Sequence, residues 1–189
     1  MSPLWYRPTD SSGKVANQKK IATQAITDQF GDPMSTALNA PIPSFDALTA
    51  TSGTTVSSET LKGQFSVLYF YPKDSTPGCT TESQDFTRLF DEFQALNCQI
   101  FGVSRDSVKS HENFKAKHDM PFELISDPDE NLCTLFDVMK LKNMYGKQVR
   151  GVERSTFLIN PDGVLTAEWR KVSVPGHAEA VLETLKTQS

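Results

Sequence analysis

The sequence predicts an α/β domain in which helices flank a mixed central sheet. Residues 65–71 and 98–104 are nearly continuous apolar segments, the pattern of strands buried on both faces of a sheet. Each is followed by a segment in which apolar residues recur at helical spacing. Two later apolar segments are joined by residues 160–163 (NPDG), which predicts a hairpin. Helix-connected strands run parallel and a hairpin is antiparallel, so the combined sheet is mixed.

Composition divides the 189 residues into two parts. Residues 1–39 are polar and rich in Ser, Thr, Gln and Lys, which predicts a flexible or weakly helical N-terminal extension. Within it, residues 15–30 have the spacing of a helix, and Met34 offers an alternative start for the chain. Residues 40–189 have the length and apolar content of one folded domain.

The domain begins with a predicted β-hairpin, residues 44–50 and 54–58, joined at residues 52–53. The first buried strand follows it. Residues 80–96 are then expected to form a helix, because a single stripe of apolar side chains recurs along them: Phe86, Leu89, Phe90, Phe93 and Leu96.

The middle of the domain continues the alternation. After the second buried strand, residues 107–118 predict a helix and residues 122–126 a short strand. Asp127 suits an N-cap and Pro128 the first helical position, so a short helix is expected to begin there and to bury Leu132, Leu135 and Phe136.

The end of the domain is a hairpin and a closing helix. Residues 155–159 and 164–170 are the two strands of the hairpin. The last helix is expected to begin near His177 and to present one apolar face, formed by Ala178, Val181, Leu182 and Leu185.

Charge and composition exclude several classes of function. The formal net charge is −4, from 19 basic and 23 acidic residues, which argues against a nucleic-acid or anionic-membrane surface. No apolar run is long enough to span a bilayer, and the N-terminus lacks the apolar segment of a secretory signal. The three cysteines have neither CxxC nor a zinc-binding spacing. We therefore expect a cytoplasmic protein with free thiols and no metal site.

The histidines do not change this conclusion. His111 and His118 lie seven residues apart on one predicted helix, where exposure is expected rather than metal binding. His177 has no partner at a ligand-like spacing. The chain also has no Gly-rich phosphate loop and no Ser-His-Asp order.

Cys79 has the strongest local signal for chemistry. Thr76 suits the N-cap of the following helix and Pro77 its first position, while Gly78 lets the backbone pass close to a bound group. Cys79 then lies near the third helical position, where free N–H groups and the helix dipole favour an anion. Helix N-termini lower the pKa of a thiol from about 8.5 to roughly 3.5–7.5. We therefore expect a reactive thiol at a polar loop-to-helix corner rather than a buried apolar one.

Cys98 and Cys133 have the opposite signal. Cys98 begins an apolar strand, and Cys133 lies among the core-facing residues of a short helix. Free cysteines in such places are usually buried and behave as small apolar side chains.

Pro72, Thr76 and Cys79 form the pattern Pro-x-x-x-Thr-x-x-Cys, which resembles the active-site signature of the peroxiredoxins. Residues 69–82 (YFYPKDSTPGCTTE) are similar in particular to the bacterioferritin comigratory protein, or peroxiredoxin Q, group of the AhpC/TSA family. The resemblance covers about residues 40–187 and implies a thioredoxin-like fold and a thiol-dependent peroxidase of antioxidant defence. Three further segments match in order and spacing: residues 102–107, 124–128 and 154–159.

The resemblance implies a role for each matching residue. Cys79 matches the peroxidatic cysteine, which attacks hydrogen peroxide or a small organic hydroperoxide and becomes a sulfenic acid. Thr76 matches the threonine that orients the peroxide, and Pro72 the proline that shields the thiolate from water. Arg154 matches the arginine that stabilises the thiolate and the departing oxygen, and Glu82 the acidic residue that holds this arginine. Because the electrons come from thiols, no metal or organic cofactor is implied.

The sequence departs from this group at the resolving cysteine. Gln84 occupies the position five residues after Cys79, and residues 107–118 contain no cysteine, so both usual resolving positions are empty. This predicts a one-cysteine mechanism in which an external thiol such as thioredoxin, glutaredoxin or glutathione reduces the sulfenic acid. Recruitment of Cys98 or Cys133 after local unwinding is the alternative. Members of the group are mostly monomers, so a monomer is expected.

Two other functions fit part of the pattern. A thiol–disulfide oxidoreductase is disfavoured because CxxC is missing. A redox sensor or partner-binding module, in which oxidised Cys79 pairs with a client protein, needs the same reactive thiol. Peroxide consumption with an external reductant separates this sensor from a peroxidase.

Overall fold

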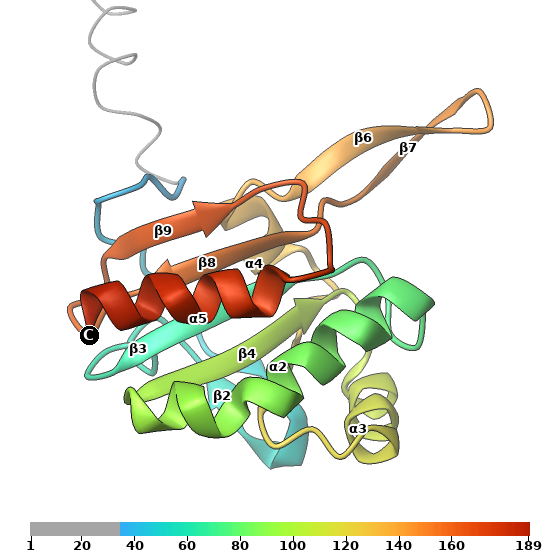
Figure 1. Ribbon diagram of the computed structural model, residues 1–189. Helices are drawn as coiled ribbons and strands as arrows, with labels where there is room; N and C mark the ends of the chain where they lie inside the picture. The colour runs from blue at the N-terminus through green and yellow to red at the C-terminus, as the bar shows by residue number, and fades with distance from the viewer. Residues whose placement is uncertain (1–34) are drawn as a thin grey trace, which may run out of the picture. The chain divides into compact units, whose positions relative to one another are not determined.

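The computed structural model describes residues 35–189, and the predictions about residues 1–34 lie outside them. The described chain forms a five-stranded sheet with helices on its faces and two small two-stranded sheets (Figure 1). The α/β class is confirmed. In chain order the elements are β1 (Leu48–Thr49), η1 (Thr51–Gly53), β2 (Thr55–Val56), β3 (Phe65–Phe70), α2 (Pro77–Ala95), β4 (Cys98–Ser104), α3 (Val108–Lys117), β5 (Glu123–Ser126), α4 (Asn131–Leu135), β6 (Met139–Met144), β7 (Lys147–Val152), β8 (Ser155–Ile159), β9 (Leu165–Trp169) and α5 (His177–Gln188).

The central sheet has the strand order β5-β4-β3-β8-β9. Strand β3 is parallel to β4, and β4 to β5, because α2 and α3 connect them as crossovers. Strand β8 is antiparallel to both β3 and β9. The predicted mixed sheet is therefore confirmed, and its central strand is β3. The chain leaving β3 reaches the carboxyl end of the parallel strands, where open α/β sheets place their sites.

Alternate side chains of β3 belong to two separate cores. Val67 and Tyr69, together with Tyr71 directly after the strand, pack in the core formed with α2 and α5. Leu68 and Phe70 pack on the other face, in the core that includes α4 and the N-terminal segment. Both faces are covered, which explains why the strand is a continuous apolar run. Helices α2 and α5 contact each other across the first face (Figure 1).

Gly102 in β4 permits a link between the sheet and α2. A Cβ atom at Gly102 would lie 2.7 Å from both the Tyr69 hydroxyl and a methyl carbon of Leu124, closer than real contacts allow. The Tyr69 side chain passes over this glycine, and its hydroxyl lies 2.9 Å from Ser83 Oγ in α2. The bare backbone at Gly102 therefore allows a central strand to be tied to the helix that carries Cys79.

The N-terminal hairpin is present, although its strands are shorter than predicted. Strands β1 and β2 pair over two residues each. The chain before them is also attached to the domain, because the Thr36 N–H donates to the Leu135 carbonyl and the Asn39 N–H to the Leu165 carbonyl. Backbone contacts to the domain thus begin ahead of residue 40.

The short helix after β5 begins later than the sequence predicts. Because α4 spans Asn131–Leu135, the expectation that Pro128 takes the first helical position was wrong. Glu130 intervenes in the left-handed region, with φ of 59°. The Asp127 carboxylate nevertheless accepts from the Asn131 N–H at 2.7 Å, so it still satisfies a free donor at the start of the helix.

Residues 139–152 form a hairpin that the sequence analysis did not predict, named here the β6–β7 arm. Its two strands pair with each other along their whole length and extend away from the domain (Figure 1). Tyr145 and Gly146 form the turn with φ of 52° and 79°, as a two-residue type I′ turn requires. Most side chains of the arm are exposed, and its sequence therefore contains no continuous apolar segment. Such segments were the basis for predicting β3 and β4.

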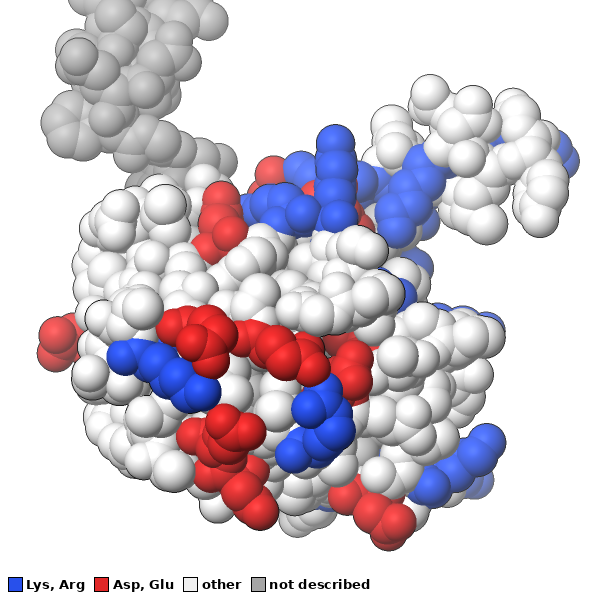
Figure 2. Space-filling view, viewed as in Figure 1, with Lys and Arg blue, Asp and Glu red and all other residues white. Residues whose placement is uncertain are grey.

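Charged side chains are interspersed over the face that α2 and α5 present (Figure 2). Several form ion pairs between the two helices, such as Arg88 with Glu179 and Lys186 with Glu92. Within the described part of the chain, no helix is long and apolar enough to cross a bilayer. The same residues contain no group of His, Cys, Asp and Glu side chains arranged to hold a metal ion.

Candidate active site

Cys79 lies in the first turn of α2, at the corner where the sequence places it. Thr76 is the N-cap, Pro77 the first helical residue and Cys79 the third. The helix follows the loop after β3, at the carboxyl end of the central strand. The thiol is more buried than its polar neighbours in the sequence suggest, because only 1% of Cys79 is exposed and it packs in the core between β3 and α2.

Arg154 provides the positive charge beside this sulfur. It lies in the two-residue link between β7 and β8, and its Nη2 donates to Cys79 Sγ at 3.3 Å. Burial works against the charge, but Glu82 and Cys79 raise the pKa of Arg154, which therefore stays a cation. A guanidinium in this position stabilises negative charge on the sulfur.

Glu82 lies one turn after Cys79 and holds the same guanidinium. Its Oε2 accepts from Arg154 Nη1, and its Oε1 is buried without a hydrogen-bond partner among the described residues. Burial raises the pKa of Glu82 to about 7, although the charge and hydrogen bond of Arg154 act in the opposite direction. The thiol and the carboxylate thus contact one guanidinium through its two terminal nitrogens.

Replacing Glu82 by glutamine is expected to flatten the pH dependence of stability between about pH 4 and pH 7. In the unfolded chain a glutamate loses its proton near pH 4.3, whereas folded Glu82 keeps its proton to about pH 7. Its contribution to the free energy of unfolding is therefore fully present below about pH 4.3 and is lost as the pH rises through 7. Urea unfolding of both proteins at several pH values measures the two slopes.

Glu59→Gln is the matched control for this measurement. Glu59 is exposed and pairs with Lys62 on the surface, so its removal should leave the wild-type slope in place. Equal slopes for wild-type protein and Glu82→Gln would contradict the raised pKa of Glu82.

Gly78 allows the guanidinium to approach the helix. A Cβ atom at this position would lie 3.3 Å from Arg154 Nη2, so a side chain would push the guanidinium by a few tenths of an ångström. We expect Gly78→Ala to slow Cys79 oxidation several-fold. The melting temperature should be unchanged or higher, since alanine favours a helix over glycine by up to about 1 kcal/mol. Stopped-flow oxidation kinetics and thermal unfolding check the two effects, and an unchanged oxidation rate would contradict the close approach.

The loop before α2 carries Pro72 and Thr76. Pro72 is half-buried in it. The Thr76 hydroxyl donates to the Lys73 carbonyl at 2.9 Å, so in this structure it closes the loop. Ser75 between them has φ of 59°, a left-handed conformation that costs about 1–2 kcal/mol for a residue with a side chain. Neighbouring contacts must hold this loop in place.

A buried network that the sequence analysis missed supplies those contacts. Asp74 lies between the two ends of the loop, and its carboxylate accepts from the hydroxyls of Tyr71 and Ser110 at 2.7 Å each. His111 Nδ1 lies 2.8 Å from Asp74 Oδ2, and both side chains are buried. Burial opposes ionisation, but His111, Tyr71 and Ser110 together lower the pKa of Asp74.

This network corrects the expected exposure of His111, which is fully buried. Its Nε2 lies 3.1 Å from the Ile125 carbonyl, an acceptor only, so Nε2 carries a proton. The ring therefore links β5 to the loop that precedes Cys79. The burial of His111 could have been inferred from its spacing to Phe114. The two residues lie three positions apart, which places both on the buried face of α3.

His177 is also close to the site, at the start of α5. Its Nε2 lies 2.7 Å from Thr156 Oγ1 in β8. Burial, followed by the charge of Arg154, lowers the pKa of His177 to about 4, so the ring is neutral at pH 7. It therefore adds no second cation beside the thiol.

Cys98 and Cys133 are separated from Cys79 by the architecture. Cys98 pairs with Phe65 at the first residue of β3, whereas Cys79 follows the last, so about 17 Å of strand separates the two ends. Cys133 packs in the core on the opposite face of the sheet. Burial raises the pKa of Cys98 to about 12 and that of Cys133 well above its usual range. Both thiols are buried, as predicted.

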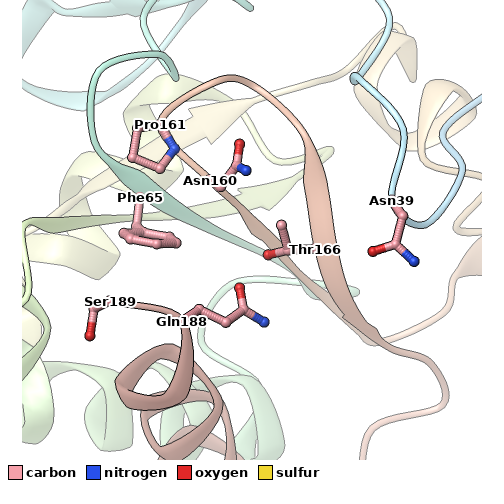
Figure 3. Close-up of a pocket in the computed structure, with 7 residues that line it drawn as sticks. All are labelled: Asn39, Phe65, Asn160, Pro161, Thr166, Gln188 and Ser189. Carbon is pink, nitrogen blue, oxygen red and sulfur yellow. The ribbon is translucent and has the colours of Figure 1, made fainter.

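A hollow of about 650 Å³ lies away from this site (Figure 3). It is located where the start of β3 meets the end of α5, the end of the sheet opposite to Cys79. Its lining contains no cysteine and no charged side chain, so it offers nothing to the thiol chemistry. The residues around it are Asn39, Phe65, Asn160, Pro161, Thr166, Gln188 and Ser189.

Comparison with known proteins identifies the family to which the chain is related. The model of the AhpC/TSA family matches residues 38–168. The peroxiredoxin Bcp of Xanthomonas campestris is 56% identical over 153 residues, which cover 80% of this chain and 96% of the relative. The peroxiredoxin Bcp of Bacillus subtilis is 51% identical over 137 residues, covering 72% of this chain and 87% of the relative.

A solved structure gives the same result for the fold. The bacterioferritin comigratory protein of Xanthomonas campestris superimposes with a TM-score of 0.76 at 54% sequence identity. The match covers 82% of this chain and 99% of that protein. The thioredoxin-like fold implied by the sequence is therefore confirmed. With a thiol, a guanidinium and a helix N-terminus assembled at one corner, the chain belongs to the AhpC/TSA family and is a peroxiredoxin, a thiol-dependent peroxidase.

Proposed function

We propose that Cys79 is the peroxidatic residue and that it reduces hydrogen peroxide and small organic hydroperoxides. The observation that carries this proposal is the 3.3 Å contact between Arg154 Nη2 and Cys79 Sγ in the first turn of α2. The thiolate attacks the outer oxygen of the hydroperoxide and the O–O bond breaks. Cys79 becomes a sulfenic acid, and the remainder leaves as water or an alcohol after taking up a proton.

Arg154 acts on both ends of this displacement. Negative charge moves from the sulfur to the departing oxygen, and a guanidinium that already contacts the sulfur has further N–H donors for that oxygen. Glu82 fixes the plane of the guanidinium, and Gly78 leaves room for it. Fixed donors of this kind need no reorganisation when the charge moves.

Thr76 and Pro72 position the substrate. The Thr76 hydroxyl donates to the Lys73 carbonyl in this structure, and a rotation about its side-chain bond turns it to the peroxide. Pro72 has no N–H and shields the thiolate from water. Holding the O–O bond in line with the sulfur contributes rate through orientation.

The burial of Cys79 favours narrow substrates. Only 1% of the residue is exposed, so a hydroperoxide whose –OOH group ends a narrow chain reaches the sulfur more readily than one with bulky groups beside the –OOH. The related Xanthomonas campestris bacterioferritin comigratory protein is described as reducing alkyl peroxides. We therefore assign small organic hydroperoxides to this chain alongside hydrogen peroxide.

An external thiol completes the cycle in this proposal. A resolving thiol must bring its Cα atom within about 7 Å of that of Cys79 to form a disulfide. Cys98 lies at the far end of the sheet and Cys133 on its other face, so the folded chain favours thioredoxin, glutaredoxin or glutathione as the source of electrons.

We also infer a monomer that acts in the cytoplasm, with catalysis confined to residues 40–189. Cys79, Glu82 and Arg154 meet within one chain, so the site needs no second copy. All three cysteines are free thiols, as is usual in a reducing compartment.

Intact-mass analysis after one equivalent of hydrogen peroxide tests the proposed route. The expected product has gained one oxygen on Cys79, and an added thiol returns it to the starting mass. A disulfide with Cys98 or Cys133 would instead assign a resolving role to one of them. Repeated peroxide consumption with an external reductant identifies a peroxidase, whereas a single oxidation that ends in a mixed disulfide with a client protein identifies a sensor.

A further inference from the structure

The β6–β7 arm exposes most of the large apolar side chains found on the described surface. Among residues 35–189, five large apolar side chains are exposed, and four of them belong to the arm. Such side chains are normally kept from water, and a contiguous group of them marks an interaction surface. They are Leu141 (68% exposed), Met144 (51%), Tyr145 (100%) and Val149 (44%).

The arm is also basic, in a chain whose net charge is −4. Residues 139–152 include Lys140, Lys142, Lys147 and Arg150 and no acidic residue. In Figure 2 the arm extends from the domain with blue and white atoms and no red ones. Lys140 and Arg150 already pair with Asp137 and Glu130, whereas Lys142 and Lys147 form no ion pair among the described residues. A partner that fits this surface therefore presents carboxylates to these two lysines, beside an apolar patch.

Strand pairing places the two kinds of side chain together. Lys142 lies opposite Val149, and Met144 opposite Lys147, so these four share one face of the arm. Lys147 lies beside the fully exposed Tyr145 of the turn. Aromatic and methionine side chains among cations are the composition of a protein-binding surface.

The base of the arm leads directly to the thiol. Strand β7 ends at Val152, two residues before Arg154, whose Nη2 lies 3.3 Å from Cys79 Sγ. Arg150 is anchored to Glu130 of the domain, so the base has a fixed position. A molecule bound along the arm is thereby brought to the side of the domain on which Arg154 lies.

We propose that the β6–β7 arm is the docking surface for the protein that reduces oxidised Cys79, a dithiol protein with an acidic, partly apolar surface beside its thiols. The inference rests on the proposed external-thiol mechanism. Each six-residue strand is about 20 Å long, far more than a small thiol such as glutathione can cover. The exposed apolar side chains lie along both strands, and a protein surface can contact all of this length. A membrane would contact only the turn at the end of the arm.

The reduction then proceeds in two balanced steps. The first thiolate of the partner attacks Cys79 sulfur, an S–S bond forms and the hydroxyl of the sulfenic acid leaves as water after protonation. The partner's second thiolate then attacks the partner's first sulfur, the one that is bonded to Cys79 in the mixed disulfide. Cys79 leaves as a thiolate and the partner becomes an internal disulfide, having supplied two electrons.

The test uses Tyr145→Ser/Lys147→Glu in the full chain, with thioredoxin and glutaredoxin as the two protein probes. We expect kcat/KM for the effective protein reductant to fall by about tenfold or more, and its salt dependence to weaken. Reduction by dithiothreitol and oxidation of Cys79 by peroxide should both stay at wild-type rates, because the turn lies away from the thiol. Leu38→Ser/Lys62→Glu is the matched control, since Leu38 is the exposed large apolar residue that remains outside the arm among residues 35–189, and Lys62 is an exposed lysine.

Several results would overturn the docking proposal. The first is an equal kcat/KM for the arm variant and wild type, and the second is a loss of kcat/KM in the control variant as large as in the arm variant. The third is reduction of wild-type protein by dithiothreitol but by neither thioredoxin nor glutaredoxin. An arm-dependent association with phosphatidylglycerol vesicles, or an arm-dependent dimer, with protein-driven reduction unchanged, would assign the arm to another partner. Absence of Cys79 oxidation in wild-type protein would instead contradict the proposed function.

Discussion

Replacing Cys79 by serine is expected to abolish peroxide consumption completely. A serine hydroxyl has nearly the same size but is a weak nucleophile and forms no sulfenic acid. Neither remaining cysteine can substitute, because burial raises the pKa of Cys98 to about 12 and that of Cys133 well above its usual range. The measurement is the loss of hydrogen peroxide with excess reductant, which should equal the rate without protein.

Cys98→Ser and Cys133→Ser are the controls for that result. Both should consume peroxide at close to the wild-type rate, since neither thiol contacts the site. Their melting temperatures should fall modestly, because a hydroxyl loses more hydration than a thiol on burial, and the Gln99 carbonyl near Cys98 and the Asp127 carboxylate near Cys133 offset only part of that loss. Residual peroxide loss in Cys79→Ser, or a loss of turnover in a folded Cys98→Ser, would contradict the one-cysteine mechanism.

The central sheet was predictable because its strands are buried on both faces. Strands β3 and β4 are continuous apolar runs in the sequence, and each is followed by a helix with one apolar face. Their order and parallel pairing follow from these patterns. The β6–β7 arm was not predictable in this way, because most of its residues are exposed and a strand without a buried face has no apolar alternation. Its only local signal is the Tyr145–Gly146 turn.

The candidate site divides in the same manner. Cys79 could be singled out from its neighbours alone, because the N-cap, proline and glycine before it define a helix N-terminus. Arg154 follows 75 residues later in a link between strands, where an arginine is ordinarily a surface cation, and only the family resemblance indicated it. Asp74 and His111 form a buried hydrogen-bonded pair across 37 residues, and no local pattern predicts which polar residues meet in a core.

Replacing Arg154 by alanine is expected to slow the oxidation of Cys79 by about 10²–10³-fold, the usual effect of removing one donor that stabilises developing charge. The variant loses the donor that lies 3.3 Å from Cys79 Sγ and, with it, the cation that stabilises the departing oxygen in the proposed mechanism. Competition for hydrogen peroxide against a second peroxidase of known rate measures the change. Arg154→Lys should be intermediate, because an ammonium keeps the charge but cannot contact Glu82 and Cys79 in the same fork geometry.

The loss of Arg154 also leaves Glu82 buried without its partner, which would by itself destabilise the fold. Breaking a buried pair in this way costs about 3–5 kcal/mol unless the remaining group changes its protonation. Glu82, whose pKa is already about 7, is expected to take up a proton. The double variant Arg154→Ala/Glu82→Gln removes both charges, so it should regain much of the stability while oxidising as slowly as Arg154→Ala. If the double variant regained the wild-type oxidation rate, Arg154 would act only by stabilising the fold and would have no part in the chemistry.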